Sequence, residues 1–257
     1  MTRLQVVGLV LILAMLTLAA IGPAITPSPN EQDLASALQP PSWDYLLGTD
    51  GLGRSVAARI ATGSRTSLLI AVTSMTIALV LGTGLALAAA LVPGLRGPIR
   101  WLLDIFQAFP SFVGILILSG IFAPTPLTIA VNVALMSWPE PCRVALLAAE
   151  SAMRSTAVEA AALVKLPRRS IALKLVLPRL ADPMAALGAM LFGQAILQVA
   201  ALGFLGLGLN PPAPEWGTMI AEALPYIADA PHLLIAPSAA VVASVGGMLL
   251  LADRDKP

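Results

Sequence analysis

The polar side chains that could interact with a solute inside this chain are few, and four of them fall in apolar stretches. Asn132 and Ser137 lie in one stretch, and Gln194 and Gln198 lie in a later one. A helix places Gln194 and Gln198 on one face because they are four residues apart. Amide and hydroxyl groups in such stretches either line a solute pathway or form hydrogen bonds between packed helices. The sequence leaves both interpretations open for these four residues.

Other kinds of chemistry find little support. Cys142 is the one cysteine and His232 the one histidine, so neither a disulfide within the chain nor a metal site is expected. The lysines are Lys165, Lys174 and Lys256, and none belongs to a Gly-x-x-x-x-Gly-Lys-[Ser/Thr] phosphate loop. We therefore expect a chain that is not an enzyme, holds no metal or cofactor, and cannot hydrolyse ATP by itself.

The composition indicates an integral membrane protein. Hydrophobic residues make up 58% of the 257 residues and charged residues only 11%, and the mean hydropathy is +0.87. Soluble domains use about 25% charged residues. The basic residues form no stripe interleaved with aromatic residues, so nucleic acid is not an expected partner, whereas membrane lipid is.

Six apolar segments have about the length that a bilayer requires. We predict spans at about 4–21, 67–92, 101–122, 127–147, 183–203 and 232–251. The first resembles a signal peptide but is long for one, so a retained anchor is favoured. The predicted organisation is an anchor helix at 1–22, an external segment at 23–66, and a core of five spans at 67–257 containing a polar loop at about 148–180.

The basic residues orient these spans. With the N-terminus inside, every lysine and arginine except Arg54, Arg59 and Arg65 falls on the cytoplasmic side. Both termini and the polar loop are therefore predicted to be cytoplasmic. The three exceptions recur at intervals of five or six residues, which favours an interfacial helix whose basic groups reach the membrane surface.

The polar loop contains a short apolar helix, predicted over 157–166 by its alanines and leucines and ended by Pro167. Val158, Ala162 and Leu166 would share one face, with Glu159 beside it. So apolar a helix should either dock in a groove on a partner protein or lie on an anionic membrane surface. The residues alone favour neither.

The spacing of this loop resembles the EAA loop of ABC importer permeases. Glu159-Ala160-Ala161 is followed at the family's distance by Leu175-x-Leu177-Pro178, with Lys165 where the family has glycine. Leu-Gly-Thr-Asp-Gly-Leu-Gly-Arg-Ser at 47–55 and Phe-Leu-Gly-Leu-Gly at 204–208, leading to Glu215-Trp216-Gly217, resemble the dipeptide, oligopeptide and nickel branch, and its second permease type. Together the motifs extend from about residue 46 to the C-terminus.

The resemblance implies an all-α fold of six transmembrane helices, the type I importer fold with a cytoplasmic coupling helix, in the inner membrane of a bacterium. It implies a second homologous permease, two ATPase subunits that hold ATP and Mg²⁺, a periplasmic or lipid-anchored substrate-binding protein, and transport by alternating access. The residues expected to dock an ATPase are Val158, Glu159, Ala160, Ala161, Ala162, Lys165, Leu166, Leu175, Leu177 and Pro178.

The external segments and the substrate are less constrained. Asp50, Arg54, Phe204, Glu215 and Trp216 are candidates either to contact the binding protein at the external mouth or to form a structural cap. An apolar residue at position 199, which is Val in this chain, resembles the nickel and metallophore branch, so nickel or a metal–metallophore complex is expected ahead of a di- or oligopeptide.

The alternative function is a self-contained secondary transporter or channel. Such a protein should show an inverted repeat or an ionisable relay within its spans, and the sequence shows neither.

Overall fold

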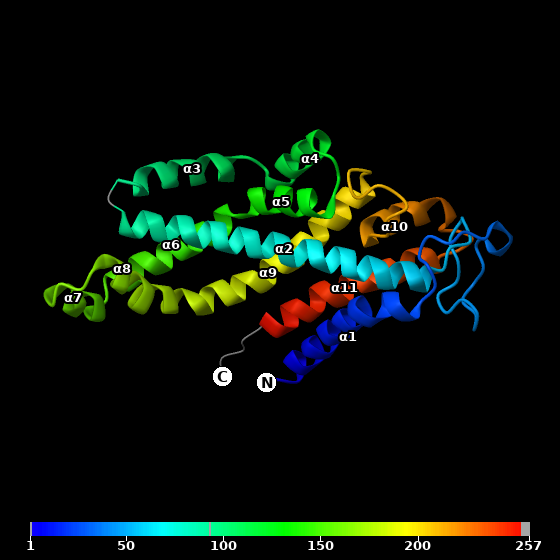
Figure 1. Ribbon diagram of the computed structural model, residues 1–257, viewed down its shortest axis with the longest axis horizontal. Coiled ribbons are helices and arrows are strands. Elements are labelled where there is room, and N and C mark those ends of the chain that lie inside the picture. The colour runs from blue at the N-terminus through cyan, green and yellow to red at the C-terminus, as the bar shows by residue number, and fades with distance from the viewer. Residues whose placement is uncertain (1, 93, 253–257) are drawn as a thin grey trace.

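The computed structural model describes residues 2–92 and 94–252, and its regular elements are all helical within that part of the chain. Figure 1 shows an elongated bundle in which α7 lies at one end and α10 at the other, close to the loops that precede α2. The all-α class predicted from the sequence is confirmed. Arg254 and Lys256, which were expected in the cytoplasm, lie outside the described residues.

Four helical segments are long and apolar enough to cross a membrane. They are α1 (Arg3–Ile25), α2 (Val56–Leu91), the continuous run Arg168–Phe204 that includes α9 (Leu177–Phe204), and α11 (His232–Ala252). The 36 residues of α2 extend over roughly 54 Å, whereas the hydrocarbon core is about 30 Å thick. At least one end of α2 therefore projects well beyond the apolar layer.

Two of the six predicted spans are interrupted. The segment at 101–122 forms α3 (Arg96–Ala108) and α4 (Ser111–Ile121), which meet at 86°. Pro110 explains the bend: it has no N–H to donate, and it disfavours helical geometry at Phe109, which is extended. The segment at 127–147 is divided at Trp138 into α5 (Pro126–Ser137) and α6 (Pro139–Met153). Among the described residues there are thus four candidate spans, or five if α3 and α4 count as one.

The remaining elements are short and lie in the connections. They are η1 (Leu34–Ser36), α7 (Thr156–Leu163), α8 (Arg168–Ile171), the π-helical turn η2 (Ala172–Val176), α10 (Trp216–Ala223) and η3 (Leu224–Tyr226).

The buried apolar side chains form two cores along the bundle. One includes Ile60 of α2, Ile196 of α9 and Trp216 of α10. The other includes Ile99 of α3, Trp138 between α5 and α6, and Val158 of α7. The short helix α7 therefore packs on the second core.

α1 packs along the outside of the bundle against α11. A Cβ atom placed on Gly8 would come within 2.6 Å of the carbonyl oxygen of Gly247, so the two backbones approach closely at small residues, as membrane helices commonly do. Only Gly8, Ala19 and Gly22 of α1 are buried. The described ends of the chain lie near each other, and α1 and α11 both extend from these ends toward α10 (Figure 1).

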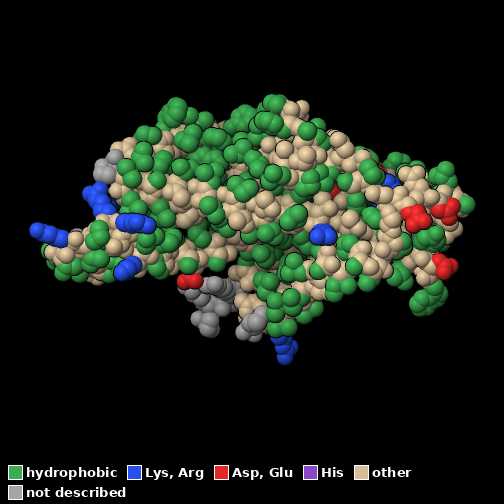
Figure 2. All heavy atoms as spheres, in the orientation of Figure 1, with side chains coloured by type: hydrophobic (Ala, Val, Ile, Leu, Met, Phe, Trp, Pro, Cys, Tyr) green, Lys and Arg blue, Asp and Glu red, His purple; other side chains and the backbone are tan. Residues whose placement is uncertain are grey.

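Charge is distributed unevenly along the bundle. On the face shown in Figure 2, basic side chains gather mainly over the α7 end and acidic side chains mainly over the opposite end, with apolar side chains between them. This is the pattern of a protein whose two ends face different aqueous compartments.

Candidate functional site

The inner face of α7 packs on the chain's own core. Val158 is 5% exposed and Ala161 is 8% exposed, and both belong to the second core. They are three residues apart and so share a helix face. The expectation that Val158 shares an outward face with Leu166 is therefore wrong. The side chain of Ala162 lies outside the described part of the structure.

The outer face of α7 and the turn after it expose apolar side chains. Glu159 and Ala160 are exposed, Leu163 is 85% exposed and Val164 is 71% exposed. Leu166 is also exposed. Large apolar side chains gathered at one protruding end are typical of a surface that meets a partner.

Lys165 adopts the backbone conformation that glycine would favour. Its φ is +54°, and the N–H of Leu166 donates to the carbonyl of Ala161 at 3.0 Å, which is the bond of a Schellman helix end. The replacement of glycine by lysine therefore preserves the left-handed turn. It places an exposed ammonium group beside the outer face of α7.

The second half of the motif forms the entry to α9. The N–H of Leu177 donates to the carbonyl of Ala172, five residues back, so the helix widens into a π turn immediately before Pro178. Leu175 is half-buried, whereas Leu177 and Pro178 are exposed.

Two hydrogen bonds tie this loop to neighbouring helices. Arg168 Nη1 donates to the carbonyl of Leu91 at the end of α2, at 3.3 Å. Arg179 Nη1 donates to the carbonyl of Ala152 in α6, at 3.4 Å.

A cavity of about 470 Å³ lies where the α3–α4 bend meets α6 and α9. Ser137, Gln194 and Gln198, three of the four polar residues singled out in the sequence, line it together. Gln198 Oε1 is buried without a hydrogen-bond partner in the described structure. Asn132 is not part of this cavity: it is 4% exposed and its Nδ2 donates to Ser119 Oγ at 3.4 Å, which joins α5 to α4.

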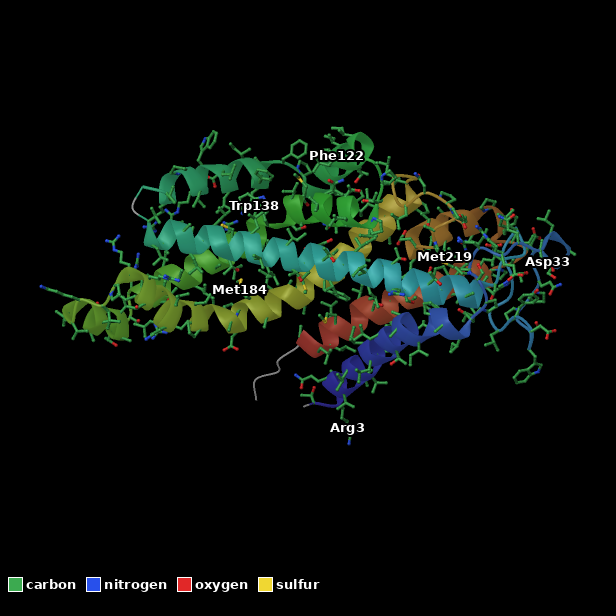
Figure 3. All side chains as sticks on the ribbon, in the orientation of Figure 1. Arg3, Asp33, Phe122, Trp138, Met184 and Met219 are labelled. Carbon is green, nitrogen blue, oxygen red and sulfur yellow. The ribbon has the colours of Figure 1, made fainter. Side chains whose placement is uncertain are left out.

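Two charged residues that sequence reasoning did not assign to a pathway, Glu140 and Arg143, also line this cavity. Arg143 donates to Gln107 at 3.0 Å, and Arg100 pairs with Glu150 at 2.9 Å. The aromatic ring of Trp138, labelled in Figure 3, packs edge-on against Phe106 with centroids 5.2 Å apart, beside the cavity.

At the opposite end, four charged side chains form a network in which both arginines are buried. Arg54 Nε lies 2.6 Å from Asp50 Oδ2, and both Arg54 Nη2 and Arg59 Nη2 contact Glu222 Oε2, at 3.0 and 2.8 Å. The side chains of Arg54 and Arg59 are 6% and 2% exposed. The prediction that these arginines reach the membrane surface is wrong, because the two carboxylates hold them inside the protein.

Two glycines with left-handed backbone geometry shape the loop that carries Asp50. Positive φ angles occur at Gly48 (+76°) and Gly53 (+72°), not at Gly51. Asp50 Oδ1 accepts from the N–H groups of Leu52 and Arg54, both at 3.0 Å. Asp50 therefore orders its own turn and also binds the arginine network.

Glu215 and Trp216 lie inside the protein, at 1% and 0% exposure. Glu215 caps α10 by accepting from the N–H groups of Gly217 and Thr218 at 2.9 and 3.0 Å, and Ser67 Oγ donates to it at 3.3 Å. Burial raises the pKa of the Glu215 carboxyl, and these three donors partly oppose that rise.

This burial favours a structural cap over contact with a binding protein, the two alternatives that the sequence left open for Glu215 and Trp216. Gly203 and Gly217 explain why the segment packs so closely. A Cβ atom on Gly217 would overlap the carbonyl oxygen of Ala200, and one on Gly203 would overlap Glu215 Oε2. Phe204, which was also a candidate for the external mouth, is 46% exposed.

Similar proteins were found by two comparisons. Residues 78–254 match the family described as binding-protein-dependent transport system inner membrane component. Residues 2–41 match the N-terminal TM domain of oligopeptide transport permease C.

Among curated proteins, the di/tripeptide transport system permease protein DppC of Pseudomonas aeruginosa is 36% identical over 254 residues, covering 96% of this chain and 84% of that protein. The dipeptide transport system permease protein DppC of Alkalihalophilus pseudofirmus is 32% identical over 98% of this chain and 83% of that protein. The dipeptide transport system permease protein DppC of Haemophilus influenzae is 29% identical over 98% of this chain and 88% of that protein.

Proposed function

Because the chain belongs to the family of binding-protein-dependent inner membrane transport components, it is a permease subunit of an ABC importer, and we propose that it imports di- or tripeptides. Family membership also decides against a self-contained secondary transporter or channel, and it implies separate ATPase and substrate-binding partners. The observation that carries the peptide proposal is the 36% identity, over 96% of the chain, to a relative named for di/tripeptide transport.

The expectation of nickel rested on Val199, whose position in the structure gives no link to a substrate. Val199 is 1% exposed and belongs to the first core. It is not among the residues that line the cavity. An apolar residue at this position therefore reflects packing of α9, and the relatives give nickel or a metallophore complex no support.

We assign ATPase docking to the outer face of α7, together with the exposed residues Leu166, Leu177 and Pro178. Leu163 and Val164 supply apolar contact area, while Glu159 and Lys165 supply charges that can fix the orientation of a partner. ATP and Mg²⁺ would be held by the ATPase. The alternative, binding of α7 to anionic lipid, is favoured by the same basic groups.

The proposed orientation places α7, α8 and both chain ends in the cytoplasm. The basic side chains at the α7 end and the acidic ones at the α10 end support it (Figure 2). The α10 end would then face the binding protein, and a second homologous permease would complete the pathway beside the cavity. Closure of the ATPases would displace α7 and, through Arg168 and Arg179, the ends of α2 and α6.

Uptake measurements test the substrate. A strain lacking this chain should lose uptake of labelled dipeptides and tripeptides and regain it when the chain is supplied, while nickel uptake stays unchanged. Loss of nickel uptake with normal peptide uptake would refute the peptide proposal.

Co-purification tests the docking surface. Glu159→Arg should reduce recovery of the ATPase subunits with the permease, whereas Glu31→Arg, which changes an exposed acid at the opposite end, should not. Normal recovery and transport with Glu159→Arg would instead favour the lipid-binding alternative.

A further inference from the structure

We infer that Glu140 and Arg143 bind the two charged ends of a zwitterionic peptide in the cavity between the α3–α4 bend, α6 and α9. Glu140 would accept from the peptide's ammonium group, and Arg143 would donate to its carboxylate. The inference rests on the proposed peptide function and names the chemistry by which the pathway would recognise that substrate.

The cavity has the size and the varied lining of a small-molecule site. Its volume of about 470 Å³ lies within the roughly 300–1,000 Å³ typical of ligand pockets. The α3–α4 bend contributes Phe109, Pro110 and Ser111, and α9 contributes Gln194 and Gln198. Because Pro110 interrupts the helix here, the bend creates space that a straight span would fill.

Glu140 is an acid without a counterion. It lies in the first turn of α6, half-buried, and no hydrogen bond or ion pair holds its carboxylate within the described structure. Acidic residues among apolar helices are normally paired, and unpaired ones mark binding or transport sites. A peptide ammonium group entering the cavity would supply the missing positive charge.

Arg143 has donors to spare. Its Nη1 donates to Gln107 Oε1 at 3.0 Å, which positions the guanidinium and leaves Nε and Nη2 without a partner in the described structure. A guanidinium suits a carboxylate because two parallel N–H groups can bind its two oxygens.

The two charges are close but do not neutralise each other. Three residues apart on α6, they share a helix face. No ion pair joins them among the described residues, although both line one cavity. Opposite charges held on one wall, each able to take another partner, match the opposite charges at the two ends of a short peptide.

The rest of the lining suits the middle of a peptide. Gln194, Gln198 and Ser137 offer donors and acceptors for a peptide bond, and Gln198 Oε1 is buried and unpartnered. Phe106, Phe109 and Met136 offer apolar contacts. Such contacts depend little on shape, and methionine adapts to different neighbours. The site would therefore recognise the termini strictly and the side chains loosely.

The test uses the complete transporter, with both permeases, the ATPases and the binding protein, in liposomes. Initial uptake of a labelled dipeptide is measured alongside ATP hydrolysis stimulated by the loaded binding protein. Glu140→Gln and Arg143→Gln should each lower uptake about tenfold or more, as expected for loss of a hydrogen bond to a charged group. Stimulated ATP hydrolysis should remain close to that of the unsubstituted protein, because docking of neither partner is changed.

Glu150→Gln is the matched control, since Glu150 is an acid on the same helix that pairs with Arg96 and Arg100 away from this cavity. It should leave uptake nearly unchanged. Glu140→Asp keeps the charge and should retain most uptake, which separates loss of binding from loss of folding.

A second measurement bypasses selection by the binding protein. Without that protein, the complex in nanodiscs should bind the free dipeptide at least tenfold more tightly than the same dipeptide carrying an N-acetyl and a C-amide group. Each Gln substitution should reduce that preference.

The outcomes separate the two proposals. Equal uptake by Glu140→Gln, Arg143→Gln and the unsubstituted transporter would overturn the inference and leave peptide import intact. Failure of the unsubstituted transporter to import any dipeptide would overturn both. A parallel fall in uptake and stimulated ATP hydrolysis, for all variants including Glu140→Asp, would show a structural role and also overturn the inference.

Discussion

Arg59 and Glu222, 163 residues apart in the sequence, meet in an ion pair of 2.8 Å. The pair joins the first turns of α2 to the end of α10. Arg54 contacts the same carboxylate oxygen, so this one acid balances two nearly buried arginines with help from Asp50. The α10 end of the bundle is thus held together by charge in addition to apolar packing.

Glu222→Gln should destabilise the α10 end of the bundle. It leaves Arg54 and Arg59 with Asp50 as their remaining acidic partner, and breaking a buried pair costs about 3–5 kcal/mol. The Glu222 side chain is 35% exposed, so water will screen the loss and about 2 kcal/mol is expected. The measurement is thermal unfolding of the purified permease in detergent. Glu31→Gln, at an exposed acid without an ion pair in the described structure, should not shift the midpoint; a shift as large as that of Glu222→Gln would contradict the assignment.

Glu215→Gln should also lower stability. The carboxylate accepts from Gly217, Thr218 and Ser67, and an amide replaces one of its acceptor oxygens with a donor. One buried N–H group would then face another donor, which costs about 1–3 kcal/mol. Hydrogen exchange at the start of α10 should accelerate. Unchanged protection there would show that another group caps the helix.

Gly217→Ala should separate α10 from α9. The added Cβ atom would overlap the carbonyl oxygen of Ala200, and overpacking costs about 1–3 kcal/mol. The matched control is Gly84→Ala, because a Cβ atom there meets no atom within 4 Å. Gly84 lies within α2, so alanine should stabilise the protein slightly, by about 0.5–1 kcal/mol. Equal unfolding temperatures for the two variants would contradict the close approach of these helices.

Lys165→Gly should preserve the turn that ends α7, whereas Lys165→Val should disrupt it. The position has a φ of +54°, which glycine adopts freely and a β-branched residue resists. Recovery of the ATPase subunits on co-purification should be normal for the glycine variant and reduced for the valine variant. If recovery falls equally in both, the ammonium group of Lys165, and not the backbone turn, is what the partner requires.

The sequence predicted the helical class and the position of the loop because both depend on local signals. Apolar segments of about 20 residues mark spans, and alanine-rich segments before proline mark a short helix. Those signals placed α7 to within a few residues. They could not show which face turns inward, and Val158 was assigned to the wrong one.

The errors at the α10 end have a different cause. Arg54 and Arg59 share the local acid Asp50, but the partner that joins them to α10, Glu222, is more than 160 residues away in the sequence. Glu215 and Trp216 have the composition of a membrane interface, yet the glycines around them allow α10 to press against α9. Long-range pairing and close backbone approach leave little trace in a local pattern. Glu140 and Arg143 were missed for the same reason, since the bend at Pro110 is what opens a cavity beside them.

The unbroken course of α2 has a mechanical consequence. Near one end, Arg59 binds Glu222, and at the other the carbonyl of Leu91 accepts from Arg168, just beyond α7. A continuous helix moves as a rigid body. A tilt of about 5° about one end would displace the other end of α2, roughly 54 Å away, by roughly 5 Å. A small displacement delivered at α7 would therefore move the Arg59–Glu222 pair at the other end of α2 directly, without a series of local rearrangements between them.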